Sequence, residues 1–200
     1  CSVCSQEITS TYYNDYWNNP YCARHYGKVP NCFSCGRIIC KSVTGGGKTY
    51  RDGRAICNLC GRTAIVDEQQ ATAAAHEVKA LLARVTLDVT GGHIPVHLAY
   101  WDEMNNSDHS DYEDNPIGLA KMTAQGSVRK MESITIVYGL PKLHFCGIYA
   151  HEMGHAWMWL NNYPDDISPQ VKEGLCNLFK YLWLKQQHTP ESKYLQHMML

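Results

Sequence analysis

Residues 146–160 read C-G-I-Y-A-H-E-M-G-H-A-W-M-W-L and contain the motif His151-Glu152-x-x-His155. On an α-helix, residues four apart lie on one face, about one turn along, so two imidazoles at this spacing can bind one Zn²⁺. Glu152 lies near the same site and can serve there as a general base. The flanking residues are mostly apolar, which predicts a helix buried on several sides. Buried His and Glu side chains need a compensating partner, and a metal ion supplies one.

A catalytic zinc takes three protein ligands and keeps a fourth position for water. The candidates for the third ligand are Asp165, Asp166, Glu173 and His188. We favour Glu173, because Ser168-Pro169 is typical of a helix start and leaves room for a turn after the His155 helix. This is the gluzincin arrangement, with His151, His155 and Glu173 as ligands. The apolar face expected for the second helix consists of Val171, Leu175, Leu178 and Leu182.

Hydrolysis also needs a donor that stabilises the oxyanion formed at the scissile carbonyl. Tyr181 and His188 are both candidates, and the sequence does not choose between them.

The chain has 10 cysteines, and eight of them lie within the first 60 residues. Four closely spaced ligand pairs occur there: Cys1-Cys4, Cys22-His25, Cys32-Cys35 and Cys57-Cys60. Each successive set of two pairs offers the four ligands of a closed tetrahedral zinc site, which predicts two structural zinc ions. A cross-braced RING arrangement is the alternative. The six residues between His25 and Cys32 favour sequential, LIM-type pairing, which leaves Cys40 as a buried thiol.

The bulk composition narrows the possible partners and locations. The 200 residues carry a formal net charge of −1, which argues against nucleic acid as the main partner. No run of 18 apolar residues exists, so no membrane span is expected. Clustered zinc ligands and the lack of a secretory signal predict an intracellular, cytoplasmic protein. Because the chain opens on a predicted ligand, Cys1, we expect it to be a fragment of a longer protein.

The remaining pattern predicts an α+β fold. Apolar residues at three- and four-residue spacing predict a long helix over residues 64–85, and residues 96–101 and 133–138 read as strands. The second strand either forms the edge of the cleft, where an extended substrate could pair with it, or lies inside the sheet. The predicted domains are a LIM-like module with two zinc fingers at residues 1–62 and a zincin-like, gluzincin-type metallopeptidase domain at residues 63–200.

Paired zinc fingers followed by I-Y-A-H-E-M-G-H-A-W-M (residues 148–158) and V-K-E-G-L-C (residues 171–176) resemble one known family. It comprises the LIM-containing, ubiquitin-activated metallopeptidases that limit organ size in plants, together with their microbial relatives. The resemblance implies a catalytic zinc on His151, His155 and Glu173, with Glu152 as the base. It also implies that the residues from Cys1 to Cys60 contact ubiquitin or ubiquitylated proteins, and that the substrates include ubiquitin ligases.

Two functions are compatible with these features of the sequence. The leading hypothesis is a zinc-dependent endopeptidase that cleaves protein substrates, with one catalytic and two structural Zn²⁺ ions and a LIM-like module for partner binding and regulation. The alternative is a LIM-type protein-binding scaffold with an inactive, zinc-stabilised peptidase-like domain. Retention of Glu152 favours the enzyme, because zinc binding alone needs only the ligands.

Overall fold

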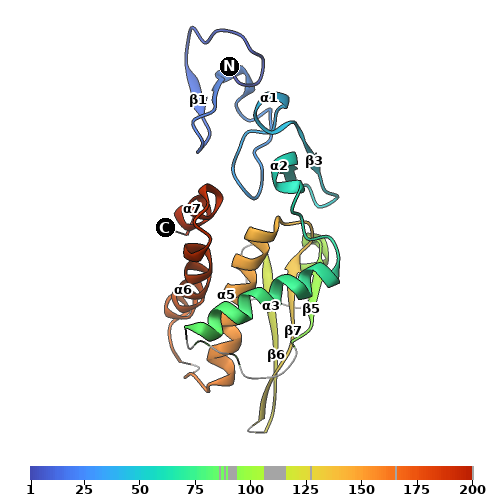
Figure 1. Cartoon of the computed structure of the whole chain (residues 1–200), viewed down its shortest axis with the longest axis vertical. Helices are drawn as coiled ribbons and strands as arrows, with labels where there is room; N and C mark the ends of the chain where they lie inside the picture. Colours follow the sequence, from blue (N-terminus) through green and yellow to red (C-terminus); the bar gives the residue numbers. More distant parts are fainter. Residues whose placement is uncertain are drawn as a thin grey trace. The chain divides into compact units, whose positions relative to one another are not determined.

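The computed structural model describes residues 1–85, 87, 89, 94–105, 116–126, 128–164 and 166–199. The chain forms two compact units, Cys1–Ala64 and Ile65–Leu200 (Figure 1). Helices and strands are mixed, which confirms the α+β class. The assignment of residues 1–62 to a LIM-like module and of residues 63–200 to a zincin-like domain stays a prediction.

Two small antiparallel hairpins organise the first unit. Each hairpin ends on a predicted ligand, since Cys22 closes the second strand of one and Cys57 closes the second strand of the other. A single helical turn follows each strand and presents the next ligand, His25 or Cys60. The elements are β1 (Tyr12–Asn14), β2 (Pro20–Cys22), η1 (Ala23–His25), α1 (Lys41–Thr44), β3 (Gly47–Thr49), β4 (Ala55–Cys57) and α2 (Asn58–Gly61).

Asp15 joins the two halves of this unit. Its buried carboxylate accepts hydrogen bonds from the backbone N–H groups of Trp17 at 2.9 Å and of Ile38 at 3.0 Å. The indole Nε1 of Trp17 donates to the carbonyl oxygen of Cys35 at 2.6 Å. Because Asp15 and Trp17 lie in the first finger and their partners in the second, polar contacts as well as metal ligands hold the unit together.

A three-stranded sheet with the order β5-β7-β6 forms the second unit. Strand β7 (Val128–Val137) is central, with β5 (Val96–Ala99) parallel to it and β6 (Gly118–Gln125) antiparallel. The strand predicted at residues 133–138 therefore belongs to an interior strand, the second of the two alternatives that the sequence left open. Strand β6 could not be predicted from the sequence, because its residues are half-buried or exposed and show no clear alternation.

The helices of the second unit are α3 (Glu68–Arg84), α4 (Trp101–Asn105), α5 (Lys142–Leu160), α6 (Pro169–Gln186) and α7 (Pro190–His197). Helix α3 confirms the long helix expected over residues 64–85. Its start is fixed by Asp67, whose side chain accepts the N–H of Gln70. Helix α5 contacts β6, β7, α3 and α6 (Figure 1), which explains why most of its residues are buried. No helix within the described residues is long and apolar enough to cross a membrane.

Helix α6 begins as predicted, with Pro169 in its first turn and the Ser168 side chain accepting the N–H of Val171. Its predicted apolar face is wrong, because Val171 is 51% exposed and Leu178 is 46% exposed. The buried face is rotated by about one residue. It comprises Cys176, Phe179, Trp183 and Leu184.

Candidate functional site

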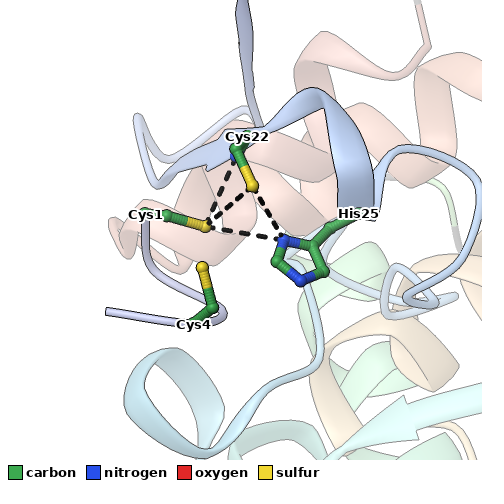
Figure 2. Close-up of side chains that lie close together, drawn as sticks. All are labelled: Cys1, Cys4, Cys22 and His25. Atoms are coloured by element: carbon green, nitrogen blue, oxygen red, sulfur yellow. Dashed lines mark hydrogen bonds between the residues drawn. The ribbon is translucent and has the colours of Figure 1, made fainter. Parts of the chain in front are cut away.

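The first predicted zinc cluster is assembled in the structure. Figure 2 shows the side chains of Cys1, Cys4, Cys22 and His25 gathered around one point. The Sγ atoms of Cys1 and Cys22 are 3.7 Å apart, and Nδ1 of His25 lies 3.6 Å from the first and 3.2 Å from the second. A tetrahedron with Zn–S bonds of about 2.3 Å has S–S edges of about 3.8 Å, so this donor set fits a structural zinc ion.

The second cluster contains four buried thiols, those of Cys32, Cys35, Cys57 and Cys60. The Sγ atoms of Cys35 and Cys57 are 3.8 Å apart, again the edge of a zinc tetrahedron. Hydrogen bonding from Cys35 lowers the pKa of the Cys32 thiol, whereas hydrogen bonding with Cys32 raises the pKa of the Cys60 thiol. The four thiols thus compete for ionisation, and a bound cation would let all four ionise.

The two four-ligand sets are sequential in the chain, as LIM-like pairing requires, and all ten cysteines are free thiols. Cys40 belongs to neither set, and its Sγ lies 3.3 Å from the carbonyl oxygen of Ser2. It is partly exposed, so the buried thiol predicted from the sequence is only half right.

Helices α5 and α6 bring His151, His155 and Glu173 together. The Nε2 atom of His151 lies 3.2 Å from one carboxylate oxygen of Glu173, and Nε2 of His155 lies 3.5 Å from the other. With metal–ligand bonds of about 2.1 Å, a tetrahedral site has edges of about 3.4 Å. These three donors therefore fit a zinc ion that keeps one position open.

The other candidates for the third ligand can also be compared with the structure. Within the described residues, neither Asp166 nor His188 joins a group of potential ligands, and Asp165 lies outside those residues. The thiol of Cys176 was not considered from the sequence, yet its Sγ lies within 4.8 Å of donor nitrogens of His151 and His155. Glu173 is not in that group, but its two carboxylate oxygens lie 3.2 Å and 3.5 Å from the Nε2 atoms of the two imidazoles, so we place Glu173 in the ligand set.

Asn177 forms a polar contact with His151, the first of the two histidines. Its Oδ1 lies 3.1 Å from Nδ1 of His151 and can accept the proton on that nitrogen. This tautomer leaves the Nε2 lone pair free for a metal. Sequence reasoning missed Asn177, although it stands four residues after Glu173 and so shares its face of α6.

The carboxylate of Glu152 is buried beside the ligands and accepts a hydrogen bond from the backbone N–H of Ala120 in β6. Burial raises the pKa of Glu152 to about 7, and a cation bound nearby would lower it again. A β-carbon on Gly118 would come within 2.5 Å of Oε1 of Glu152. Only glycine at this position therefore lets β6 lie so close to the carboxylate.

The ligands and Glu152 open onto a cleft of about 500 Å³. Helix α5, helix α6 and the β6 side of the sheet line this cleft. The lining residues are Pro116, Ile117, Gly118, Leu119, Ala120, Met122, Ile148, His151, Glu152, His155, Pro169, Glu173, Asn177 and Lys180.

A smaller pocket of about 100 Å³ shares Met122 and His155 with the cleft and continues to Met158 and Trp159. Neither Tyr181 nor His188 is among the described residues that line either cavity. The structure thus brings neither predicted oxyanion donor to the site.

Comparison with known proteins shows that this chain is similar to a group of plant proteins. The model of the DA1-like family, described as Protein DA1, matches residues 102–198. Among curated proteins, Protein DA1-related 2 of Arabidopsis thaliana is 28% identical over 86% of this chain. Protein DA1 of the same plant is 25% identical over 92% of the chain, and LIM domain-containing protein HDR3 of Oryza sativa subsp. japonica is 24% identical over 96%.

The chain spans 38%, 41% and 45% of the length of these three relatives, respectively. No solved structure matches it significantly. The family model covers the cleft, and the plant relatives extend across both units. The resemblance predicted from the motifs is thus confirmed, and the chain is a relative of the plant DA1-type proteins.

Proposed function

We propose that this chain is a zinc-dependent endopeptidase of the gluzincin type. The observation that carries the proposal is the convergence of His151, His155 and Glu173 beside the buried carboxylate of Glu152, on an open cleft. A structural metal site would need no general base and no access for a substrate. Similarity to DA1-type proteins adds support without naming a reaction.

In this proposal His151, His155 and Glu173 hold the catalytic zinc, which when bound acidifies water and polarises a carbonyl group. Glu152 takes a proton from the attacking water and delivers it to the leaving amine. Strand β6 is the edge of the sheet beside the cleft, so an extended substrate can pair with its backbone. These roles together describe hydrolysis of a peptide bond within an extended chain.

The first unit, with its two candidate structural zinc sites, would serve partner binding and regulation. One rice relative is named as LIM domain-containing, which agrees with a LIM-like role for this unit. We propose ubiquitin, ubiquitin ligases and other protein substrates as the partners to test. Binding of ubiquitin to residues 1–64 in solution would be measured by titration with an isotopically labelled chain.

Elemental analysis of the full chain tests the metal assignment. We expect three zinc ions per chain, falling to two in Glu173→Ala. Three ions in both proteins would place the third ligand elsewhere. Two ions in the unaltered chain would favour the alternative, a binding scaffold with an inactive peptidase-like unit.

A Glu152→Gln variant tests the enzyme itself. It should keep its zinc and its partner binding while it loses cleavage of an unfolded protein such as casein. Cleavage that persists in this variant would remove Glu152 from the role of base. Absence of cleavage by the zinc-loaded unaltered chain would contradict the peptidase proposal.

A further inference from the structure

Lys180 contributes a cation to the wall of the cleft. It lies on the same face of α6 as Glu173 and Asn177, further along the helix, and lines the cavity with them. Its side chain passes over α5, where Cγ would lie 3.7 Å from a β-carbon on Gly147. Among the described residues that line the larger cleft, Lys180 is the one lysine or arginine.

Within the part of the chain that the structure describes, this cation has no ion-pair partner. Among the described residues, no carboxylate lies within ion-pair distance of Lys180, and no hydrogen bond to its side chain is found there. Burial lowers the pKa of its ammonium group, and the negative charge of Glu152 raises it. A half-buried ammonium that faces a cavity without a partner is stabilised by any anion that enters the cavity. The cleft is therefore suited to a ligand that carries a carboxylate.

The contacts of β6 with α5 show where Lys180 lies along the cleft relative to the metal ligands. At one end of the cleft, Gly118 of β6 lies beside Ile148 and Glu152 of α5, at the level of Lys180. At the other end, Met122 of β6 lies beside His155 and leads into the smaller pocket. Strand β6 thus runs from the Lys180 end of the cleft toward the smaller pocket, with the ligands between them.

This direction fixes which part of a substrate would meet Lys180. A peptide that adds to the outer edge of β6 as an antiparallel strand runs opposite to β6, from the smaller pocket toward Lys180. Its residues before the scissile bond would lie near Met122, and the residues after the bond would lie near Lys180. The Met122 end and the Lys180 end of the cleft would therefore contact different parts of the same peptide, on opposite sides of the scissile bond.

We propose that Lys180 forms a subsite for an acidic side chain, Asp or Glu, in the residues that directly follow the scissile bond. The proposal rests on the peptidase function above and adds a substrate class to it. Lys180 acts here through its charge on the bound peptide, as a determinant of specificity.

Cleavage of a peptide library tests the preference. The zinc-loaded chain is incubated with peptides from a digested proteome, and the new termini are identified by mass spectrometry. We expect Asp and Glu to be enriched after the cleaved bond, and the enrichment to disappear in Lys180→Met and to reverse toward Lys in Lys180→Glu. Lys185→Met, an exposed lysine on the same helix, is the matched control and should keep the enrichment.

A general loss of cleavage in Lys180→Met with unchanged preference would assign Lys180 to oxyanion stabilisation and would overturn the subsite. For Glu- and Gln-containing versions of one cleaved peptide, the ratio of kcat/KM should be about tenfold or more in the unaltered chain and near one in the variant.

A binding measurement separates this proposal from the peptidase function. The probes are two hydroxamate compounds in which the residue after the metal-binding group is Glu or Gln, titrated calorimetrically into zinc-loaded Glu152→Gln. We expect the Glu compound to bind about tenfold more tightly, and Lys180→Met in the same background to abolish the difference.

The subsite would be overturned if the preference for the Glu compound were the same with and without Lys180. It would also be overturned if neither compound bound. A Lys180-dependent preference in a protein that cleaves no peptide would leave the subsite standing and contradict the peptidase proposal.

Discussion

Gly154 of α5 lies directly against the backbone of Cys176 of α6, where a β-carbon on Gly154 would come within 2.8 Å of the Cys176 Cα atom. Van der Waals contact does not allow so short a distance, so the missing side chain permits this approach. Helix α5 carries His155 and α6 carries Glu173, one residue and three residues from the contact. The separation of the helices at this point therefore sets the distance between the ligands.

Gly154→Ala should force the two helices apart. We expect the free energy of unfolding to fall by about 1–3 kcal/mol, the usual cost of overpacking, despite the higher helix propensity of alanine. Urea denaturation followed by circular dichroism measures the change. Gly174→Ala on α6 is the control, because no atom lies within 4 Å of its β-carbon position, and it should be neutral or stabilising. Equal stabilities for the two variants would show that the contact is not tight.

Gly118→Ala should displace the general base. Its new β-carbon would meet Oε1 of Glu152 at 2.5 Å and Cγ2 of Ile148 at 2.6 Å. Because the carboxylate is at the free end of its side chain, it should move, and kcat/KM should fall by about 100-fold with zinc content unchanged. Gly147→Ala in α5 makes only ordinary contacts, with Leu184 and with Lys180, and should leave Glu152 in place. Full activity in Gly118→Ala would contradict the positioning role.

Asn177→Leu removes the acceptor for Nδ1 of His151 while nearly keeping the volume of the side chain. We expect the affinity of the third zinc site to fall by about 10- to 100-fold, as for other groups that orient metal-bound histidines. Competition with a fluorescent chelator measures this affinity. Asn177→Asp keeps an acceptor oxygen and should keep or raise the affinity. A Leu variant that binds zinc as the unaltered chain does would show that Asn177 does not orient the ring.

Thiol reactivity reports on the structural zinc ions. Seven of the ten free cysteines lie in the two four-ligand clusters, which leaves Cys40, Cys146 and Cys176. Cys146 and Cys176 are fully buried, and burial raises the pKa of the Cys146 thiol to about 12. In the zinc-loaded chain only Cys40 should react quickly with a disulfide reagent, because the thiolate is the reactive form.

Treatment with a chelator should then release the seven cluster thiols for rapid reaction, since zinc fingers lose their fold with their metal. Cys146→Ala should show the same counts of fast thiols as the unaltered chain, both before chelation and after it. Many fast thiols in the zinc-loaded chain would contradict the two closed sites.

Features that depend on local spacing could be predicted from the sequence alone. Pairs such as Cys32 and Cys35 meet within one turn of chain, and His151 and His155 share a helix face wherever that helix lies. The start of α6 was equally local, because Ser168 caps the helix with its own side chain. These arrangements need no knowledge of distant residues, so the ligand pairs and the start of α6 could be predicted.

Which helix faces and strand edges meet depends on the packing of the whole unit. Helix α6 has two apolar faces about one residue apart, and the contact of Gly154 with Cys176 selects the one that is buried. The placement of β6 beside Glu152, which made residues 133–138 interior, depends on pairing between separate strands. The hydrogen bond of Asn177 to His151 and the exposure of Lys180 in the cleft follow from the same packing. Such contacts join residues far apart in the chain, and their free energies arise only when the whole unit has formed.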